Sequence, residues 1–169
     1  MDEGTIRTYQ PADLPRLQRI TMDAFGAVSI DMNLERKYGV INGVDWKTRK
    51  ADHIRIDVER EPAGIFVLEI GGEIAGYITT WCNQLAGIGN IPNLALDAEH
   101  RGRGFGRKLI EHALAYFREQ GMTHARIETL EQNDVGLSLY PSLGFEEIAR
   151  QVHYCLELGA DNDGDGPLT

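Results

Sequence analysis

The chain has 169 residues and a mass of 18.9 kDa, which is the size of one ordinary domain with a substantial core. Its residues are 42% hydrophobic and 25% charged, and no apolar run approaches the roughly 20 residues needed to span a bilayer, so we expect no membrane partner. The net charge of -9 disfavours sequence-independent binding to nucleic acid, which needs clustered positive charge, but it tolerates a cationic substrate.

The N-terminal third is expected to begin with a strand and to continue with helices. Residues 1–10 lack the basic-then-apolar order of a secretory signal, so we expect a cytoplasmic location. Alternating side chains predict a strand over 6–9, and the helical spacing of apolar residues predicts a helix over 14–25. Two more helices are expected at about 33–38 and 45–59.

The middle of the chain is typical of three strands followed by a long helix. Residues 65–70 and 74–81 are rich in β-branched and aromatic side chains, and the Gly-Gly pair at 71–72 indicates a two-residue hairpin turn between them. These two strands are therefore expected to pair antiparallel. A further strand is predicted over 91–96, and residues 106–120 place their apolar side chains on one helical face.

The C-terminal third adds a strand over 125–130, a short helix over 134–143 and a final strand pair over 145–158 that is broken near Gln151. We expect residues 1–158 to form one domain and the acidic residues 159–169 to form a disordered tail. The predicted fold class is α/β, or α+β by stricter definition, with a mixed, mostly antiparallel sheet of about seven strands flanked by helices.

The stretch RGRGFG, residues 101–106, lies between a predicted strand and a predicted helix. At such a place, free backbone N–H groups and the helix dipole can hold an anion. The glycines let the backbone approach phosphate oxygens closely, and the neighbouring arginines add positive charge. Its spacing fits neither the dinucleotide fingerprint G-x-G-x-x-G nor the P-loop. Taken alone, the stretch is also open to a second interpretation, a tight turn with solvated arginines.

Two segments of the chain resemble the GNAT N-acetyltransferase family. NLALDAEHRGRGFGRKLIEHAL is similar to the cofactor-binding segment of that family, with its strand, arginine, x-x-G-x-G turn and amphipathic helix. NDVGLSLYPSLGF is similar to the family's N…LY…GF segment. Together they cover residues 93–145, and the order of predicted elements also fits. The resemblance implies an acyltransferase that uses acetyl-CoA and a sheet whose central strands splay apart.

The resemblance also implies which residues bind the donor. Main-chain groups of the splayed strand would bind pantetheine, backbone amides of the Gly-rich turn would bind the pyrophosphate, and an asparagine would contact the arm of the cofactor. The implied acetyl-CoA site comprises Leu94, Ala95, Leu96, Arg101, Gly102, Arg103, Gly104, Phe105, Gly106, Arg107 and Asn133. At Gly102, close relatives often carry a bulky polar residue, so the turn is looser here but loses no amide.

An amine must be neutral before it can attack a thioester. At pH 7 roughly one in seven α-amines and one in a few thousand lysine amines is neutral, so a general base is required. Glu128 lies near the middle of the strand predicted over 125–130, five residues before Asn133 and twelve before Tyr140. This spacing resembles GNAT enzymes similar to the ribosomal-protein N-terminal acetyltransferases, in which such a glutamate is the base. Glu131 and a water relay are rival bases, and a solvent-facing Glu128 without a catalytic role is the plain alternative.

Tyr140 matches the family tyrosine that protonates the departing CoA thiolate. The reference pKa of tyrosine is near 10 and that of a thiol is about 8.5, so proton transfer from tyrosine to the thiolate has little driving force and depends on positioning. The alternative is a ring that only packs on the sheet. Pro141 follows directly and disfavours the α conformation at Tyr140, so a shift of the hydroxyl is expected. The expected oxyanion donor is a backbone N–H of Leu94 or Leu96.

The acceptor is expected to be an amine, and its class stays open. A protein or peptide N-terminal amine is slightly favoured by the Glu128 spacing, whereas a small-molecule amine fits the acidic charge and the unusual segment 26–62. A non-catalytic CoA-binding or sensing module is the competing class, and the presence of both Glu128 and Tyr140 argues against it. The length of the acyl group and a homodimer are also left open.

No metal site is predicted from the sequence. The five histidines show no H-E-x-x-H or other tight ligand spacing. Residues 161–166 mimic the opening of an EF-hand loop, but no carboxylate follows at the twelfth position. Cys82 and Cys155 lie far apart in a chain without an export signal, so a disulfide is not expected either.

Overall fold

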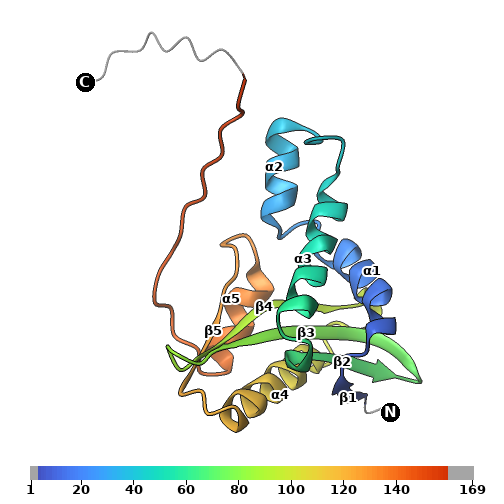
Figure 1. Ribbon diagram of the computed structural model, residues 1–169, viewed down its shortest axis with the longest axis vertical. Coiled ribbons are helices and arrows are strands. Elements are labelled where there is room, and N and C mark those ends of the chain that lie inside the picture. The colour runs from blue at the N-terminus through green and yellow to red at the C-terminus, as the bar shows by residue number, and fades with distance from the viewer. Residues whose placement is uncertain (1–3, 160–169) are drawn as a thin grey trace.

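A computed structural model describes residues 4–159, which form one sheet with helices on both of its faces (Figure 1). The strands are β1 (Thr5–Thr8), β2 (Ile65–Ile70), β3 (Glu73–Asn83), β4 (Ile88–Leu96) and β5 (His124–Ile127). The helices are α1 (Leu14–Ala24), α2 (Ile30–Tyr38), α3 (Trp46–Arg60), α4 (Phe105–Glu119) and α5 (Asp134–Ser142). Each predicted helix is therefore present, with boundaries that differ by a few residues.

The sheet is mixed and has the strand order β1-β2-β3-β4-β5. The first four strands pair antiparallel with their neighbours, and β5 runs parallel to β4. The hairpin between β2 and β3 turns at Gly71 and Gly72, which have φ of 59° and 84° and so adopt the left-handed region that favours glycine. The predicted fold class is confirmed, but the sheet has five strands where about seven were expected.

The two strands that are missing from the sheet are those predicted over residues 145–158. In the structure these residues are extended, but none of the described strands includes them. The alternating sequence pattern indicates an extended backbone, yet it does not specify the sheet edge with which that backbone pairs. The predicted disordered tail, 159–169, lies outside the described residues except for Gly159.

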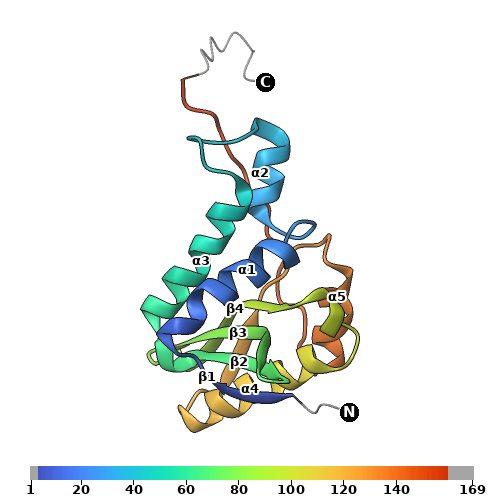
Figure 2. The ribbon, with the colours of Figure 1, turned by 90° about the vertical axis from the view of Figure 1, so that its right-hand side faces the viewer.

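The helices pack on the two faces of the sheet as separate layers (Figure 2). α4 covers one face, and the buried side chains that it contributes share one side of the helix: Leu109, Ile110, Ala113 and Phe117. α1 and α3 cover the opposite face with Leu17, Ile20, Ile54 and Val58. β4 contacts both layers, because Leu94 and Leu96 pack toward α4 whereas Ala95 packs toward α1 and α3.

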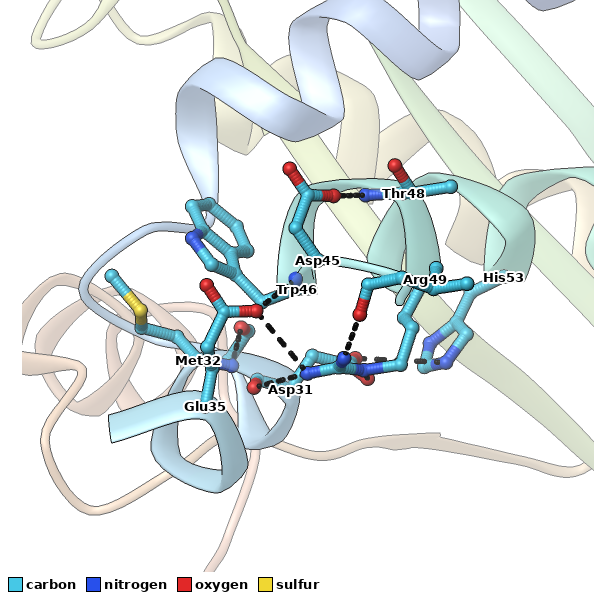
Figure 3. Close-up of polar contacts among 10 residues, drawn as sticks. Asp31, Met32, Glu35, Asp45, Trp46, Thr48, Arg49 and His53 are labelled. Atoms are coloured by element: carbon cyan, nitrogen blue, oxygen red, sulfur yellow. Dashed lines mark hydrogen bonds and ion pairs between the residues drawn. The ribbon is translucent and has the colours of Figure 1, made fainter. Parts of the chain in front are cut away.

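Polar contacts join α2 to the first turns of α3 (Figure 3). The Arg49 guanidinium lies between the two helices, 3.4 Å from Asp31 Oδ1 and 3.6 Å from Glu35 Oε2. The same Glu35 carboxylate accepts a hydrogen bond from the backbone N–H of Trp46, at 2.5 Å. The segment 26–62, which was the hardest part of the sequence to interpret, thus contains a helical pair joined by polar contacts of Arg49, Glu35 and the Trp46 backbone.

Candidate active site

The Gly-rich turn lies between β4 and α4, where the sequence predicts it. Gly104 is the N-cap of α4 with φ of 84°, Gly102 has φ of 71°, and Gly106 lies in the first turn of the helix. The two positive angles are ones that other residues adopt only with steric strain. No side chain caps this end of α4, so its first N–H groups and the positive end of the helix dipole face the turn. This geometry suits an anion such as a pyrophosphate.

Three arginines surround the turn and stay partly or fully exposed. Arg101 donates a hydrogen bond to the carbonyl oxygen at the end of β4, at 3.0 Å. The Arg103 guanidinium lies 5.3 Å from the centre of the Phe105 ring, which is itself buried in the core. Arg107 donates to a serine hydroxyl at the end of α5, at 2.7 Å. The turn therefore presents positive charge, while Phe105 contributes only its backbone to the surface.

β4 and β5 pair over their first residues and then part, as the resemblance implies. The register ends where Ile91 lies opposite Ile127, although β4 continues to Leu96. Pro92, the next residue of β4, has no N–H with which to continue the ladder. We call the gap beside residues 92–96 the β4–β5 opening. After it, Asp97 and a short 3-10 helix (Ala98–His100) connect β4 to the Gly-rich turn.

The backbone of β4 directs two of its N–H groups into the β4–β5 opening. Successive residues of a strand point their backbone groups toward opposite edges. The Asp97 N–H donates to the Ala75 carbonyl at the start of β3, so Ala95 also faces β3. Leu94 and Leu96 consequently face the opening. The N–H groups of Leu94 and Leu96, which are the expected oxyanion donors, therefore both lie on the open side of the strand.

Asn133 holds the start of α5 next to the β4–β5 opening. Its Oδ1 accepts a hydrogen bond from the Gly136 N–H at 3.2 Å, and its Nδ2 donates to the Thr129 hydroxyl at 2.8 Å. Gly136 is buried, and a Cβ at this position would come within 2.8 Å of the asparagine amide. The Asn133 side chain therefore serves first as a helix cap. It keeps one lone pair and one N–H for a further partner.

Tyr140 lies near the end of α5, and its ring packs against the core under α4 together with Leu94 and Leu96. The ring centre is 6.3 Å from that of Phe145 in an edge-on arrangement. Burial raises the pKa of the Tyr140 hydroxyl. The helix continues through Pro141, because a proline in the last turn removes only one helical donor. Tyr140 therefore keeps a helical position despite the proline.

Glu128 lies just after the end of β5 and not in the middle of a strand, so this part of the sequence prediction is wrong. β5 ends at Ile127 because β4, its one strand partner within residues 4–159, offers no N–H at Pro92. The Glu128 side chain is 71% exposed, and Oε1 lies 2.9 Å from the Arg126 guanidinium. The rival base Glu131 is also exposed and pairs with Arg150 at 2.6 Å.

A cavity of about 330 Å³ lies on the α3 side of the sheet, at the beginning of the β4–β5 opening. Its charged and aromatic lining comes from α3, β3, β5 and the residue that follows β5, and comprises Lys50, His53, Asp57, Arg60, Trp81, Arg126 and Glu128. Ile56 of α3 and residues 90–93 of β4 complete it. Trp81 lines this cavity, whereas Trp46 is buried in the core. We call it the acceptor-side cavity.

A polar network at the wall of the acceptor-side cavity was not predicted. Asp57 Oδ2 accepts hydrogen bonds from the Thr79 hydroxyl and from Asn93 Nδ2, both at 2.7 Å. Lys50 Nζ donates to Asn93 Oδ1 at 2.8 Å, and burial lowers the pKa of this lysine. Lys50 and Asp57 are seven residues apart on α3, so they share a helix face. That spacing was the one sequence signal for the network.

Some features concern the whole of the described chain. Within residues 4–159, no group of three or more His, Cys, Asp and Glu side chains could hold a metal ion, and the EF-hand-like residues 161–166 lie outside this range. Over the same range, no helix has the length and apolar composition needed to cross a membrane. Cys82 and Cys155 are free thiols.

The sequence matches the acetyltransferase (GNAT) family over residues 28–145. It is 33% identical over 154 residues to a mycothiol acetyltransferase of Thermomonospora curvata, covering 90% of this chain and 48% of that protein. It is 28% identical over 89 residues to the ribosomal protein bS18-alanine N-acetyltransferase of Escherichia coli K12, covering 53% of this chain and 59% of that protein.

Solved structures show the same fold. The PaiA N-acetyltransferase of Thermoplasma acidophilum, solved in complex with coenzyme A, aligns with a TM-score of 0.68 at 18% identity, covering 85% of this chain and 90% of that one. At this identity the likeness concerns the fold alone. The chain spans about half the length of the curated relatives that it matches.

Proposed function

Because the chain belongs to the acetyltransferase (GNAT) family, we propose that it moves an acetyl group from acetyl-CoA to a primary amine by direct attack. The β4–β5 opening carries this proposal. Its first residues, Pro92 and Asn93, line the acceptor-side cavity, and its last residue, Leu96, precedes the Gly-rich turn. A CoA thioester along this opening has its pyrophosphate at the start of α4 and its acetyl group near Glu128.

Glu128 is the proposed general base. Its carboxylate lines the acceptor-side cavity, and Arg126 at 2.9 Å restricts its position. Glu128 takes a proton from the ammonium group of the acceptor, and the nitrogen lone pair then attacks the thioester carbonyl carbon. Glu131 is the weaker candidate, since it is not among the residues that line this cavity.

Leu94 and Tyr140 are proposed to act on the tetrahedral intermediate. The Leu94 N–H, or that of Leu96, donates to the oxygen that becomes negatively charged as the N–C bond forms. The C–S bond then breaks, and the Tyr140 hydroxyl gives its proton to the departing thiolate. The extra proton on the attacking nitrogen passes through water to the Tyr140 phenolate, and Glu128 releases its proton to solvent. Because burial raises the pKa of Tyr140, the hydroxyl stays protonated in the neutral range until the thiolate forms.

We slightly favour a protein or peptide N-terminal amine as acceptor, within the cytoplasm. The Glu128 spacing and the similarity to an alanine N-acetyltransferase support this class. A small-molecule amine is the second candidate, because the relative that matches 90% of this chain is named a mycothiol acetyltransferase. The charged lining of the acceptor-side cavity includes Asp57 and Glu128 but also Lys50, Arg60 and Arg126, so its charge does not favour one class of amine over the other.

The proposal is tested by following thiol release from acetyl-CoA with a panel of amines. The panel contains Ala- and Ser-initiated peptides, the same peptides with blocked N-termini, a polyamine and an amino sugar. We expect saturable thiol release with at least one free amine, and mass spectrometry should place the acetyl group on its nitrogen. Blocked peptides serve as the matched control, because they differ only in the reacting amine.

Two outcomes would count against the proposal in different ways. Saturable CoA binding by calorimetry without thiol release for any amine favours the alternative of a CoA-binding or sensing module. Absence of CoA binding removes both interpretations. Release that is faster with longer acyl-CoA donors would change the transferred group but not the assignment of the site.

A further inference from the structure

Residues 146–158, which we call the C-terminal segment, extend away from the body of the protein. After α5 the chain runs as a single extended stretch toward α2 (Figures 1 and 2). Two polar contacts fix its course: Arg150 pairs with Glu131 at 2.6 Å, and the Tyr38 hydroxyl donates to the Cys155 carbonyl at 2.7 Å. The C-terminal segment thus reaches α2 without joining the sheet.

Apolar side chains on the C-terminal segment are exposed to solvent. Five of them are between 64% and 92% exposed: Ile148, Val152, Tyr154, Leu156 and Leu158. They all occupy even positions, whereas the odd positions from 147 to 157 carry mostly polar or charged side chains. Such alternation is typical of a strand with one buried face. In this arrangement, the apolar face of the strand lacks a cover.

The outer edge of β5 is a complementary surface. β5 is the last strand of the sheet and pairs only with β4 within the described chain. Its outward backbone groups can therefore accept another strand. Beside this edge, Ala125, Ile127, Leu139 and Leu143 pack on the α4 core but stay only partly buried. An added strand with one apolar face would cover them.

We propose that the protein forms a dimer in which the C-terminal segment of each copy adds as a strand to the outer β5 edge of the other copy. In each copy the segment's own contacts direct it toward α2, so the segment and the edge are both available to a partner. In a two-fold symmetric dimer, each C-terminal segment pairs with the β5 edge of the other copy, so neither edge is left unpaired. The exchange also gives each sheet a further strand, which the sequence pattern predicts over residues 145–158 and which the single chain does not form.

The size of this surface is sufficient for a stable dimer. An unfolded chain exposes about 1.45 Å² per dalton, so an extended segment of this length exposes on the order of 2,000 Å². Burying half of it in each copy exceeds the roughly 800 Å² per partner that stable interfaces bury. The exchanged strand would also lie next to Arg126 of β5 and Glu128 just after it, and would form an outer wall of the acceptor-side cavity.

The proposal is tested on the full chain by sedimentation velocity over a concentration series. We expect the wild type to sediment with twice the chain mass of 18.9 kDa at micromolar concentrations. The double variant Tyr154→Asp/Leu156→Asp should raise the dimer dissociation constant by about 100-fold or more, because it buries unpaired charge. The control is Leu85→Asp, which introduces one aspartate at a fully exposed leucine between β3 and β4 and should leave the dimer intact.

Hydrogen exchange separates strand exchange from other arrangements. In the wild-type dimer, amides of residues 146–158 and of β5 should exchange slowly, and both sets should become fast in the monomeric variant. If the double variant loses its far-UV circular dichroism, Val152→Asp repeats the test with a single charge. A wild-type monomer, or a dimer that the aspartates do not weaken, overturns the proposal. Slow amides in a monomer would mean that the segment folds onto its own sheet, which also overturns it.

Discussion

At the scale of single residues, the two proposed proton-transfer groups lie on opposite faces of the sheet. Glu128 lines the acceptor-side cavity under α3, whereas Tyr140 packs against the core under α4. The β4–β5 opening lies between them, because its residues Pro92 and Asn93 line the acceptor-side cavity whereas Leu94 and Leu96 pack toward α4. A thioester in this opening is approached by the acceptor from one face while the thiolate leaves toward the other. This division suits one base and one acid.

Replacing Glu128 by glutamine tests the base. We expect Glu128→Gln to lower kcat/KM for the best amine by about 100-fold or more, since positioned proton transfer contributes factors of this size. The affinity for CoA, measured by calorimetry, should stay unchanged because Glu128 lines the acceptor-side cavity and not the Gly-rich turn. Glu131→Gln is the matched control and should keep nearly full activity. The opposite pattern would transfer the role to Glu131.

Replacing Tyr140 by phenylalanine tests the acid. Tyr140→Phe should lower kcat by about 100-fold while stability changes little, because none of the hydrogen bonds found among residues 4–159 involves its hydroxyl. Burial raises the pKa of Tyr140, so the wild-type rate should fall only at a pH above the ordinary value of about 10. The variant should lack this alkaline fall. A pH profile with an unchanged alkaline limb would assign that limb to another group.

At the scale of elements, the start of α4 combines two requirements that the sequence expresses in different ways. Phe105 is apolar because its ring enters the core, whereas Gly104 is required by its backbone angle of 84°. A Cβ at Gly104 would meet no atom within 4 Å, so the requirement is conformational and does not come from lack of space. A residue with a Cβ at position 104 would therefore change the backbone angles of the turn, and with them the direction of the first N–H groups of α4.

Gly104→Ala tests this requirement. The left-handed conformation costs a residue with a Cβ about 1–2 kcal/mol, so the backbone of the turn should shift and the CoA affinity should fall by about tenfold. Gly121→Ala is the matched control: Gly121 follows the other end of α4 with φ of 77°, and a Cβ there would also meet no atom within 4 Å. It should lose similar stability by thermal unfolding but keep its CoA affinity. Equal affinity losses in both variants would mean that only helix stability matters.

The elements were predictable to different degrees, and for physical reasons. Helices such as α4 depend on local periodicity and a glycine start, so the sequence is sufficient to place them within a residue or two. β5 ends earlier than its β-forming residues suggest, because strand length depends on the partner, and β4 offers Pro92 at that point. The same dependence explains residues 145–158, whose alternation is clear but whose partner is not encoded locally.

The site was predictable where backbone geometry determines it and not where side chains from distant elements meet. The Gly-rich turn and the strand before it could be found because they are consecutive in the sequence. The network of Lys50, Asp57 and Asn93 could not, because α3 and β4 meet only in the folded chain. Glu128 was identified by its spacing, although its assumed place within a strand was wrong.

At the scale of the whole molecule, β4 connects the two packed layers. Its side chains alternate between the core under α4 and the core under α1 and α3, and the β4–β5 opening lies along the same strand. A ligand that fills the opening contacts a strand on which both layers depend. Binding should therefore stabilise the described fold as one cooperative unit and not the C-terminal half alone.

Thermal unfolding with CoA tests this coupling. A ligand present at about 100 times its Kd stabilises the folded state by about 2.7 kcal/mol. For a chain of this size, each kcal/mol raises Tm by about 2–4 °C, so CoA should raise Tm by about 5–10 °C. Calorimetry should show one transition that moves as a whole, because β4 belongs to both layers. At the same CoA concentration, Gly104→Ala should show a smaller rise than Gly121→Ala. Two transitions, of which only one moves with CoA, would contradict the coupling, and no rise at all would argue against a CoA site in the opening.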